Sequence, residues 1–352
     1  MRRTTALAKC LLISLLALLM SLSWSSSVSA GFNVWTGNRL EGGQILALAV
    51  DSQTPATIYA GTMDGGVFKS TDGGASWSFT GLTNMYVPAL ALDPQTPATI
   101  YAGTESGVFK STDGGGNWSY TGRPANNLRT LAIDPLAPDT LYAGADGGVF
   151  KSTDGGVHWV AANAGLANTG VHILALNPLA PATLYAGTLG GGVFKSTDGG
   201  GSWNQVNNGL TNTKVYALAL NPQTPAIIYA GTESGEVFKS TDGGTSWSAI
   251  INGLAITRVF ALAVDPQTPA IIYAGIWGGV FKSTDSGAHW GEINNGLTDT
   301  RVLVLALDPQ TSTIIYAGTW GGSVFSMHQL EEEIYLPPVQ KHGWRRELER
   351  IQ

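Results

Sequence analysis

The chain has 352 residues, a formal net charge of −6, 46 glycines and only 12% charged residues. This length is enough for one large all-β domain or two ordinary domains. The acidic balance argues against a nucleic-acid partner, because nucleic-acid affinity rests on clustered Lys and Arg. The only cysteine, Cys10, lies near the N-terminus, so the rest of the chain has no disulfide or thiol chemistry.

The N-terminal segment has the features of a secretory signal peptide. Basic residues precede an apolar run from 11 to 22, and Val28-Ser29-Ala30 provides a small-residue cleavage site. We therefore expect residues 1–30 to be a signal peptide and the protein to be secreted or extracytoplasmic, in the periplasm or at the cell surface. No transmembrane segment is expected after cleavage, although an uncleaved anchor remains an open alternative.

One motif, Ser-Thr-Asp-x-Gly-x-x-Trp, organises the rest of the chain. It first occurs at residues 70–77 and returns at intervals of 41–44 residues. A fixed period of this size is typical of an array of supersecondary units that bury their apolar faces against one another. The Asp and Trp of the six copies, which we call boxes, are Asp72 and Trp77, Asp113 and Trp118, Asp154 and Trp159, Asp198 and Trp203, Asp242 and Trp247, and Asp285 and Trp290.

Each unit contains four short runs separated by turn residues. In the first unit these are residues 45–51, 57–61 and 66–70, followed by a run that begins at the box Trp. Short runs rich in β-branched and aromatic residues, bounded by Gly, Pro, Asn and Asp, indicate strands. Four antiparallel strands repeated at this period predict the blades of a β-propeller. The first three runs occur seven times, so we predict an all-β, seven-bladed propeller over residues 31–328.

The fourth run occurs only six times after a box, and the seventh copy is expected at the other end of the chain. Residues 32–37 resemble the outer-strand segment Ser78-Phe79-Thr80-Gly81, which predicts that the N-terminal strand closes the last blade. Ser326-Met327-His328 stands where the seventh box would begin. Residues 329–352 lack the period and are expected to form a tail, either loosely docked or serving as an attachment or partner segment.

The repeated Ser-x-Asp-x-Gly-x-x-Trp motif resembles the Asp-box, or BNR, repeat of sialidases, xyloglucan-degrading hydrolases and sortilin-type receptors. It is also similar to that of the exported assembly factors of photosystem II, which are single seven-bladed propellers. The resemblance covers the first six blades. Because the repeat occurs in enzymes and non-enzymes alike, it implies an architecture and not an activity.

The box chemistry is interpreted as structural. Asp72 can accept backbone N–H groups across a tight hairpin, Gly74 permits a positive φ, and Trp77 can plug the outer end of the blade. The loop supplies too few oxygen ligands for calcium, and the single histidines, including His172, form no spaced metal-binding pair. We therefore expect no metal and no cofactor.

A ligand site is expected where the units differ, on the face opposite the boxes. There, the turns between the second and third strands contain acids on blades 1, 2, 3 and 5, and the catalytic candidates in a hydrolase would be Asp64, Glu105, Asp146 and Glu233. The same turns of the last two blades contain tryptophans, and polar or basic residues lead into the inner strands. The predicted ligand-binding residues are Trp277, Trp320, Arg258, Arg301, Arg129, Lys214 and Tyr86.

The favoured functional interpretation is an exported, monomeric, non-catalytic propeller that binds a protein or a glycan on this face. The alternative is a glycoside hydrolase of the sialidase or xyloglucanase type that uses the acids of the same face. A third possibility is a surface scaffold with no specific ligand. Trp277 and Trp320 could anchor a ligand, or they could cap the channel and pack on neighbouring blades.

Overall fold

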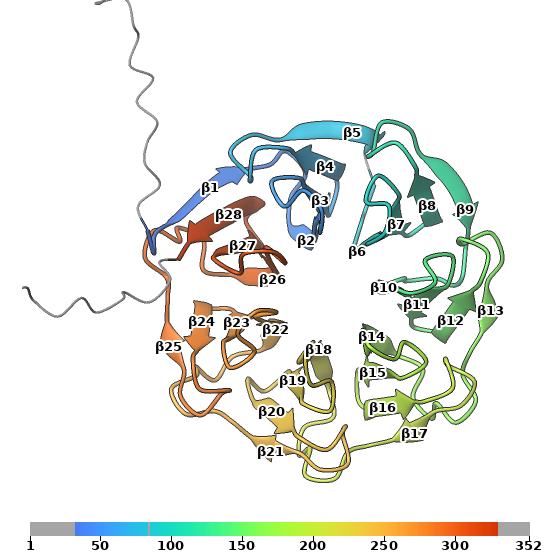
Figure 1. The fold of residues 1–352 in the computed structure, drawn as a ribbon, viewed down its shortest axis with the longest axis vertical. Helices are drawn as coiled ribbons and strands as arrows, with labels where there is room; N and C mark the ends of the chain where they lie inside the picture. Colours follow the sequence, from blue (N-terminus) through green and yellow to red (C-terminus); the bar gives the residue numbers. More distant parts are fainter. Residues whose placement is uncertain (1–31, 84, 330–352) are drawn as a thin grey trace, which may run out of the picture. The chain divides into compact units, whose positions relative to one another are not determined.

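The computed structural model describes residues 32–83 and 85–329. These residues form seven four-stranded antiparallel sheets that stand in a ring around a central channel (Figure 1). The predicted seven-bladed β-propeller is confirmed, as is its closure by the N-terminal strand. The expected signal peptide and residues 330–352 of the expected tail lie outside the described residues. No helix able to cross a membrane occurs in the described part of the chain.

The blades are numbered along the chain, and the strands of each blade are given in order from the channel outward. Blade 1 comprises β2 (Ile45–Val50), β3 (Ile58–Thr62), β4 (Gly66–Ser70) and β5 (Ser78–Thr83). Blade 2 comprises β6 (Ala89–Leu92), β7 (Ile100–Thr104), β8 (Gly107–Ser111) and β9 (Ser119–Gly122). Blade 3 comprises β10 (Thr130–Ile133), β11 (Leu141–Ala145), β12 (Gly148–Ser152) and β13 (Val160–Ala161).

Blade 4 comprises β14 (Val171–Leu176), β15 (Leu184–Thr188), β16 (Gly192–Ser196) and β17 (Asn204–Gln205). Blade 5 comprises β18 (Val215–Leu220), β19 (Ile228–Thr232), β20 (Val237–Ser240) and β21 (Ser248–Ala249). Blade 6 comprises β22 (Val259–Val264), β23 (Ile272–Ile276), β24 (Gly279–Ser283) and β25 (Gly291–Glu292). Blade 7 comprises β26 (Val302–Leu307), β27 (Ile314–Thr319), β28 (Ser323–His328) and β1 (Trp35–Arg39).

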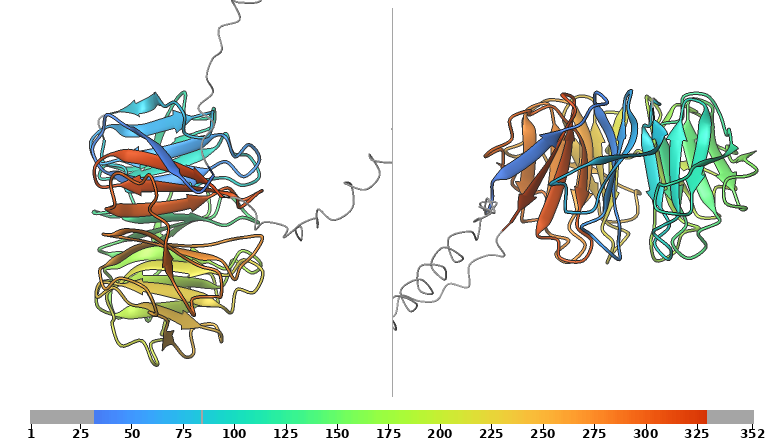
Figure 2. Two further views of the ribbon diagram at one scale, coloured as in Figure 1. Left: turned by 90° about the vertical axis from the view of Figure 1, so that its left-hand side faces the viewer. Right: turned by 90° about the horizontal axis from the view of Figure 1, so that it is seen from above.

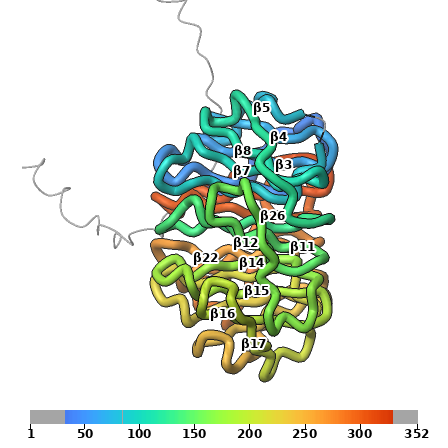
Figure 3. Tube along the Cα trace, turned by 90° about the vertical axis from the view of Figure 1, so that its right-hand side faces the viewer, coloured from blue at the N-terminus to red at the C-terminus, as the bar shows by residue number. Residues whose placement is uncertain are grey.

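The apolar core lies between blades, not within one blade. The second strands of blades 1–6, such as β3, are buried at every position, because the sheets on both sides cover them. A typical cluster joins Tyr142 of blade 3 to Leu184, Phe194 and Trp203 of blade 4. Figure 3 shows successive blades lying side by side along one edge of the ring. A single unit would expose both of its apolar faces, whereas the closed ring covers the faces of every unit.

The boxes form tight hairpin turns. In the first box, the backbone N–H of Ser76 donates to Asp72 Oδ1 at 2.8 Å, and Ser70 Oγ donates to the same oxygen at 2.8 Å. Gly74 has a φ of 89° and donates its N–H to Ser70 Oγ at 2.9 Å. The hydrogen bonds that Asp72 itself accepts, led by those from the side chain and backbone of Ser76, lower its pKa below its ordinary value.

The box also connects neighbouring blades. Lys69 Nζ and Tyr59 Oη both donate to the carbonyl oxygen of Gly114, in the box turn of the next blade, at 3.0 and 3.1 Å. Trp203 Nε1 donates backward to the carbonyl oxygen of Ala162 at 2.7 Å. Each of these bonds crosses a blade boundary, so the box stabilises the ring as well as its own hairpin.

Trp35 occupies the box Trp position of blade 7. Thr36 pairs with Ser326 as Ser78 pairs with Lys69, so Trp35 aligns with Trp77, and Thr36 corresponds to Ser78 and not to Thr80. In this register Ser326 corresponds to Lys69, so the position at which the seventh box would begin is Met327 and not Ser326 as expected. The N–H of Trp35 donates to Asn295 O at 2.8 Å, the bond that Trp203 makes to Ala164. The N-terminal strand therefore supplies both the missing strand and the missing tryptophan.

The turns divide between two faces, seen edge-on in Figure 2. The box turn adjoins the turn that follows the inner strand, since the N–H of Gly73 donates to Ala56 O at 2.9 Å. We call this side the box face. The turns between second and third strands instead adjoin the segments that enter the inner strands, as the bond from Met63 N to Gln44 O at 3.0 Å shows. We call that side the variable face.

Candidate functional site

A β-bulge at the start of the inner strand directs one side chain of each of five blades into the channel mouth. In β14, Val171 pairs with Thr188 and Ile173 pairs with Gly187, which leaves His172 as the extra residue. The same register shift occurs in β2, β18, β22 and β26. Bulges commonly re-aim a side chain in this way. With the corresponding residues of blades 2 and 3, they form a rim: Leu46, Pro88, Arg129, His172, Tyr216, Phe260 and Leu303.

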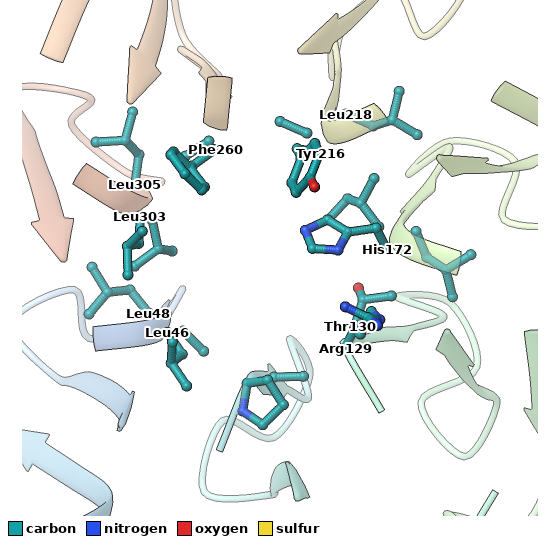
Figure 4. Close-up of a pocket in the computed structure, with 18 of the residues that line it drawn as sticks. Leu46, Leu48, Arg129, Thr130, His172, Tyr216, Leu218, Phe260, Leu303 and Leu305 are labelled. Atoms are coloured by element: carbon teal, nitrogen blue, oxygen red, sulfur yellow. The ribbon is translucent and has the colours of Figure 1, made fainter. Parts of the chain in front are cut away.

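The rim surrounds a cavity of about 310 Å³ at the variable face. His172, Tyr216 and Phe260 project into the opening from neighbouring blades (Figure 4). Below the rim the lining includes alanines and one leucine from each blade, such as Leu48 and Leu305, which pack against the core clusters between blades. The mouth is therefore polar on one side of its rim, aromatic or aliphatic on the other, and apolar at its base.

Five aromatic rings form a continuous wall from the cavity to the outer surface. His172 meets the edge of Tyr216 at 4.7 Å between ring centroids, and Tyr216 meets Phe260 at 6.2 Å. Phe260 stacks on Trp277 at 5.6 Å with 25° between the ring planes. Trp277 meets Trp320 edge to face at 5.8 Å and 82°. The two tryptophans are 46% and 41% exposed, so the outer end of the wall is available for contact.

Arg258 lies against this wall and belongs to a three-residue charge cluster. Its guanidinium carbon is 4.4 Å from the centroid of Tyr216 and 5.4 Å from that of Phe260. Its Nη2 is 3.0 Å from Glu233 Oε1, while Lys214 Nζ is 2.7 Å from Glu233 Oε2. One carboxylate thus faces two cations. The bond from Lys214 is the main reason that the pKa of Glu233 lies below its ordinary value.

Two more ion pairs lie on the variable face. Arg129 donates from Nε and Nη2 to Asp146 Oδ1, at 3.1 and 2.7 Å. Asn127 donates to the other carboxylate oxygen, and this bond is the main cause of the lowered pKa of Asp146. Arg301 Nε donates to Asp299 Oδ1 at 3.1 Å. Arg301 and Trp277 also form an isolated β-bridge, which fixes the backbone beneath the tryptophan.

His172 is the histidine of the rim, and its surroundings move its pKa away from neutral pH. Its Nδ1 is buried, and no described residue offers it a hydrogen-bond partner. Burial, followed by the nearby charges of Arg129 and Arg258, lowers the pKa of His172 to about 4. At pH 7 the imidazole is therefore neutral. The nearby charges of Arg129 and Arg258 disfavour a proton on it more than that of Asp146 favours one.

The structure thus groups most of the residues that were expected to bind a ligand. Arg129 is part of the rim, and Lys214, Arg258, Arg301, Trp277 and Trp320 lie beside it on blades 5–7. Tyr86, on the segment that enters blade 2, is half-buried, and its pKa is raised chiefly by burial. Asp64 and Glu105 are exposed on the turns of blades 1 and 2.

Sequence reasoning missed three aromatic rim residues, His172, Tyr216 and Phe260. The signal was present in the repeat. The second position of the inner run differs in every blade except 1 and 7, whereas its neighbours are nearly constant. A position that varies while its neighbours are alike indicates a side chain that does not pack inside the blade.

No group of three or more His, Cys, Asp or Glu side chains able to hold a metal ion occurs within residues 32–83 and 85–329. The six box carboxylates are instead engaged by their own turns, as the pair of Asp198 with Ser202 illustrates. The chemistry available at the channel mouth is therefore aromatic contact, hydrogen bonding and charge.

No protein-family model matches the chain, and no curated protein is similar to it in sequence. Solved structures share its fold. The GH74 xyloglucanase from Xanthomonas campestris aligns with a TM-score of 0.67 and 20% identity, over 84% of this chain and 54% of its own. The GH74 enzyme from Niastella koreensis aligns with a TM-score of 0.65 and 21% identity, over 78% and 50%. The chain therefore spans about half the length of these GH74 structures.

A structure of YCF48 bound to a D1 peptide aligns with a TM-score of 0.67 and 14% identity, over 86% of this chain and 98% of that one. The similar structures thus include propellers from glycoside hydrolases and a propeller with a bound peptide. At these identities the similarity establishes a shared propeller fold. It does not decide between binding and catalysis.

Proposed function

We propose that the protein is an exported binding or assembly propeller that holds a protein or glycan ligand on the variable face without converting it. The observation that carries this proposal is the continuous aromatic wall, whose two half-exposed tryptophans lie beside the channel mouth. Trp side chains supply a large contact area at low entropic cost and dominate many binding surfaces. The expected signal peptide would bring this surface out of the cytoplasm.

The hydrolase interpretation has less support from the site. Glycoside hydrolysis uses a pair of carboxyl groups, one of them protonated through a raised pKa. Glu233 and Asp146 are instead ion-paired, and their pKa values are lowered. Asp64, Glu105, Asp146 and Glu233 lie on four different blades. We therefore favour binding over catalysis.

Replacing both Trp277 and Trp320 with Ala tests the proposal. We expect ligand capture from native extracts by the immobilised full chain to weaken at least tenfold, because the exposed contact area at the end of the wall is lost. Thermal unfolding should change little, since both side chains are only half-buried. Quantitative mass spectrometry of captured protein and glycan would provide the measurement.

The matched control changes exposed apolar residues on the box face, Leu136→Ala together with Leu179→Ala, and should leave capture intact. Capture that survives the tryptophan changes would show that the ligand binds elsewhere. Turnover of a β-glucan or sialoside that disappears in Glu105→Gln or Glu233→Gln would overturn the non-catalytic proposal.

A further inference from the structure

The cavity at the channel mouth has the dimensions and lining of a pocket for one side chain. Its volume of about 310 Å³ lies at the lower limit of ligand pockets. Below the rim the lining is mostly Leu and Ala, with aromatic contact from Phe260 and Tyr216. An apolar group that entered could contact Leu46, Phe260 and Leu303 on one side of the rim, opposite the polar side formed by Arg129 and His172.

The arrangement of the tryptophans disfavours an oligosaccharide as the occupant. Sugar rings stack on the faces of aromatic side chains. One face of Trp277 is already covered by Phe260, and Trp320 stands nearly perpendicular to it. The pair therefore offers no common plane for consecutive sugar units.

The charge beside the pocket is unbalanced on the side of blades 5 and 6. Lys214 and Arg258 both pair with Glu233, whereas the second carboxylate of this turn, Glu236, accepts a hydrogen bond from Ser234 Oγ at 2.8 Å. Arg258 uses one nitrogen for this contact, while its guanidinium lies over Tyr216 at the rim. The lowered pKa of His172, to which Arg258 and Arg129 contribute, is consistent with a positive potential here. A ligand carboxylate would complete the cluster.

We propose that the channel mouth binds a polypeptide through one aromatic or branched aliphatic side chain, with an adjacent acidic residue of the same segment pairing with Lys214 and Arg258. The apolar side chain enters the cavity past Phe260 and Leu303, while the peptide backbone crosses the rim near His172. The inference rests on the proposed function and deepens it, since it names the ligand class and the anchor.

The test uses short peptides that are blocked at both ends, so that no terminal charge contributes. The reference is Ac-Gly-Phe-Glu-Gly-NH₂ with a 4-fluorophenylalanine label, observed by ¹⁹F NMR in the presence of the full chain. Replacing its Phe with fluorinated Ala should weaken binding at least tenfold, and replacing Glu with Gln should weaken it about threefold to tenfold. A xyloglucan heptasaccharide added as competitor should not displace the reference peptide.

Two variants assign the contacts. Leu303→Trp fills the mouth and should weaken the Phe-Glu peptide at least tenfold, whereas Leu136→Trp on the box face should leave binding unchanged. Lys214→Gln removes one of the two cations beside Glu233. The protein should then no longer bind the peptide with Glu more tightly than the peptide with Gln. Circular dichroism spectra that match the parent protein would show that each variant is folded.

The outcomes separate this inference from the proposed function. If no peptide binds, or if Leu303→Trp binds as the parent does, the pocket inference is wrong even where capture still depends on Trp277 and Trp320. Displacement by the heptasaccharide would favour a glycan. If peptide binding depends on Leu303 but ligand capture is unchanged when both tryptophans are replaced, the aromatic wall is not the binding surface.

Discussion

At the scale of single residues, the molecule contains two kinds of polar side chain. The box carboxylates are exposed but fully hydrogen-bonded, and their own turns hold the pKa of Asp113 and Asp198 at about 2. His172 is the opposite case, because its Nδ1 is buried without a partner. Polar groups left unsatisfied in this way are uncommon in packed interiors and are more frequent at sites that receive another molecule.

His172 should make stability depend on pH in a defined window. Its folded-state pKa of about 4 lies below the ordinary value of 6.5, so the unfolded chain binds the proton first. Stability should therefore fall as pH decreases from about 6.5 to about 4, by roughly 1–3 kcal/mol from this group. His172→Phe should reduce that loss, as measured by urea unfolding at pH 7.5 and 4.5. Tyr216→Phe is the neighbouring control and should keep the slope of the parent protein.

At the scale of elements, the repeat made the strands predictable, but it did not reveal which side chains meet at the channel mouth. Residues such as Tyr59 and Phe68 recur because every blade must fill the same space between its neighbours, so period and strand type follow from sequence. The bulge that exposes Tyr216 depends on pairing register, which one strand alone does not specify. The ion pairs of Glu233 likewise join turns from different blades, and only the closed ring brings them together.

Gln329 takes the place of the missing seventh box turn. Lys282 Nζ donates to its side-chain oxygen at 2.6 Å, and its side-chain nitrogen donates to Tyr273 Oη at 2.7 Å. In blade 1 the corresponding Lys and Tyr contact a carbonyl oxygen of the next box. A side-chain amide thus substitutes for a backbone turn and joins blade 6 to blade 7.

Gln329→Ala should lower the free energy of unfolding by about 1–3 kcal/mol, because a buried pair of hydrogen bonds is lost. Gln267→Ala, which removes an exposed contact to Pro309 O, is the matched control and should cost less than about 0.5 kcal/mol. Urea unfolding of both variants provides the comparison. Equal effects would contradict the role assigned to Gln329.

At the scale of the whole molecule, stability depends on closure of the ring. Every blade buries its faces against two neighbours, so an opening between blades 7 and 1 would expose two apolar faces at once. Trp35 is 2% exposed and packs in the cluster that joins blades 6 and 7. A second closure lies on the box face, where the side chain of Gln310 donates to Ser52 O at 3.0 Å.

Trp35→Ala should cost about 3–5 kcal/mol, the range for removing a buried aromatic side chain. Trp77→Ala removes the same side chain from the equivalent position of blade 1, where it is only partly buried, and should cost less. Guanidinium unfolding monitored by far-ultraviolet circular dichroism would compare them. A Trp35→Ala protein as stable as the parent would show that β1 is dispensable.

The pairing of β1 with β28 also sets a timetable for folding. Thr36 and Ser326, which meet across this pair, are 290 residues apart in sequence. Because β1 precedes the seven blades' other described strands in the chain, it acquires its partner only when blade 7 has been made. Until then Trp35 and an unpaired strand edge are open to wrong partners. Contacts between such distant residues also form slowly, so ring closure is expected to be the late, aggregation-sensitive step in the maturation of this protein.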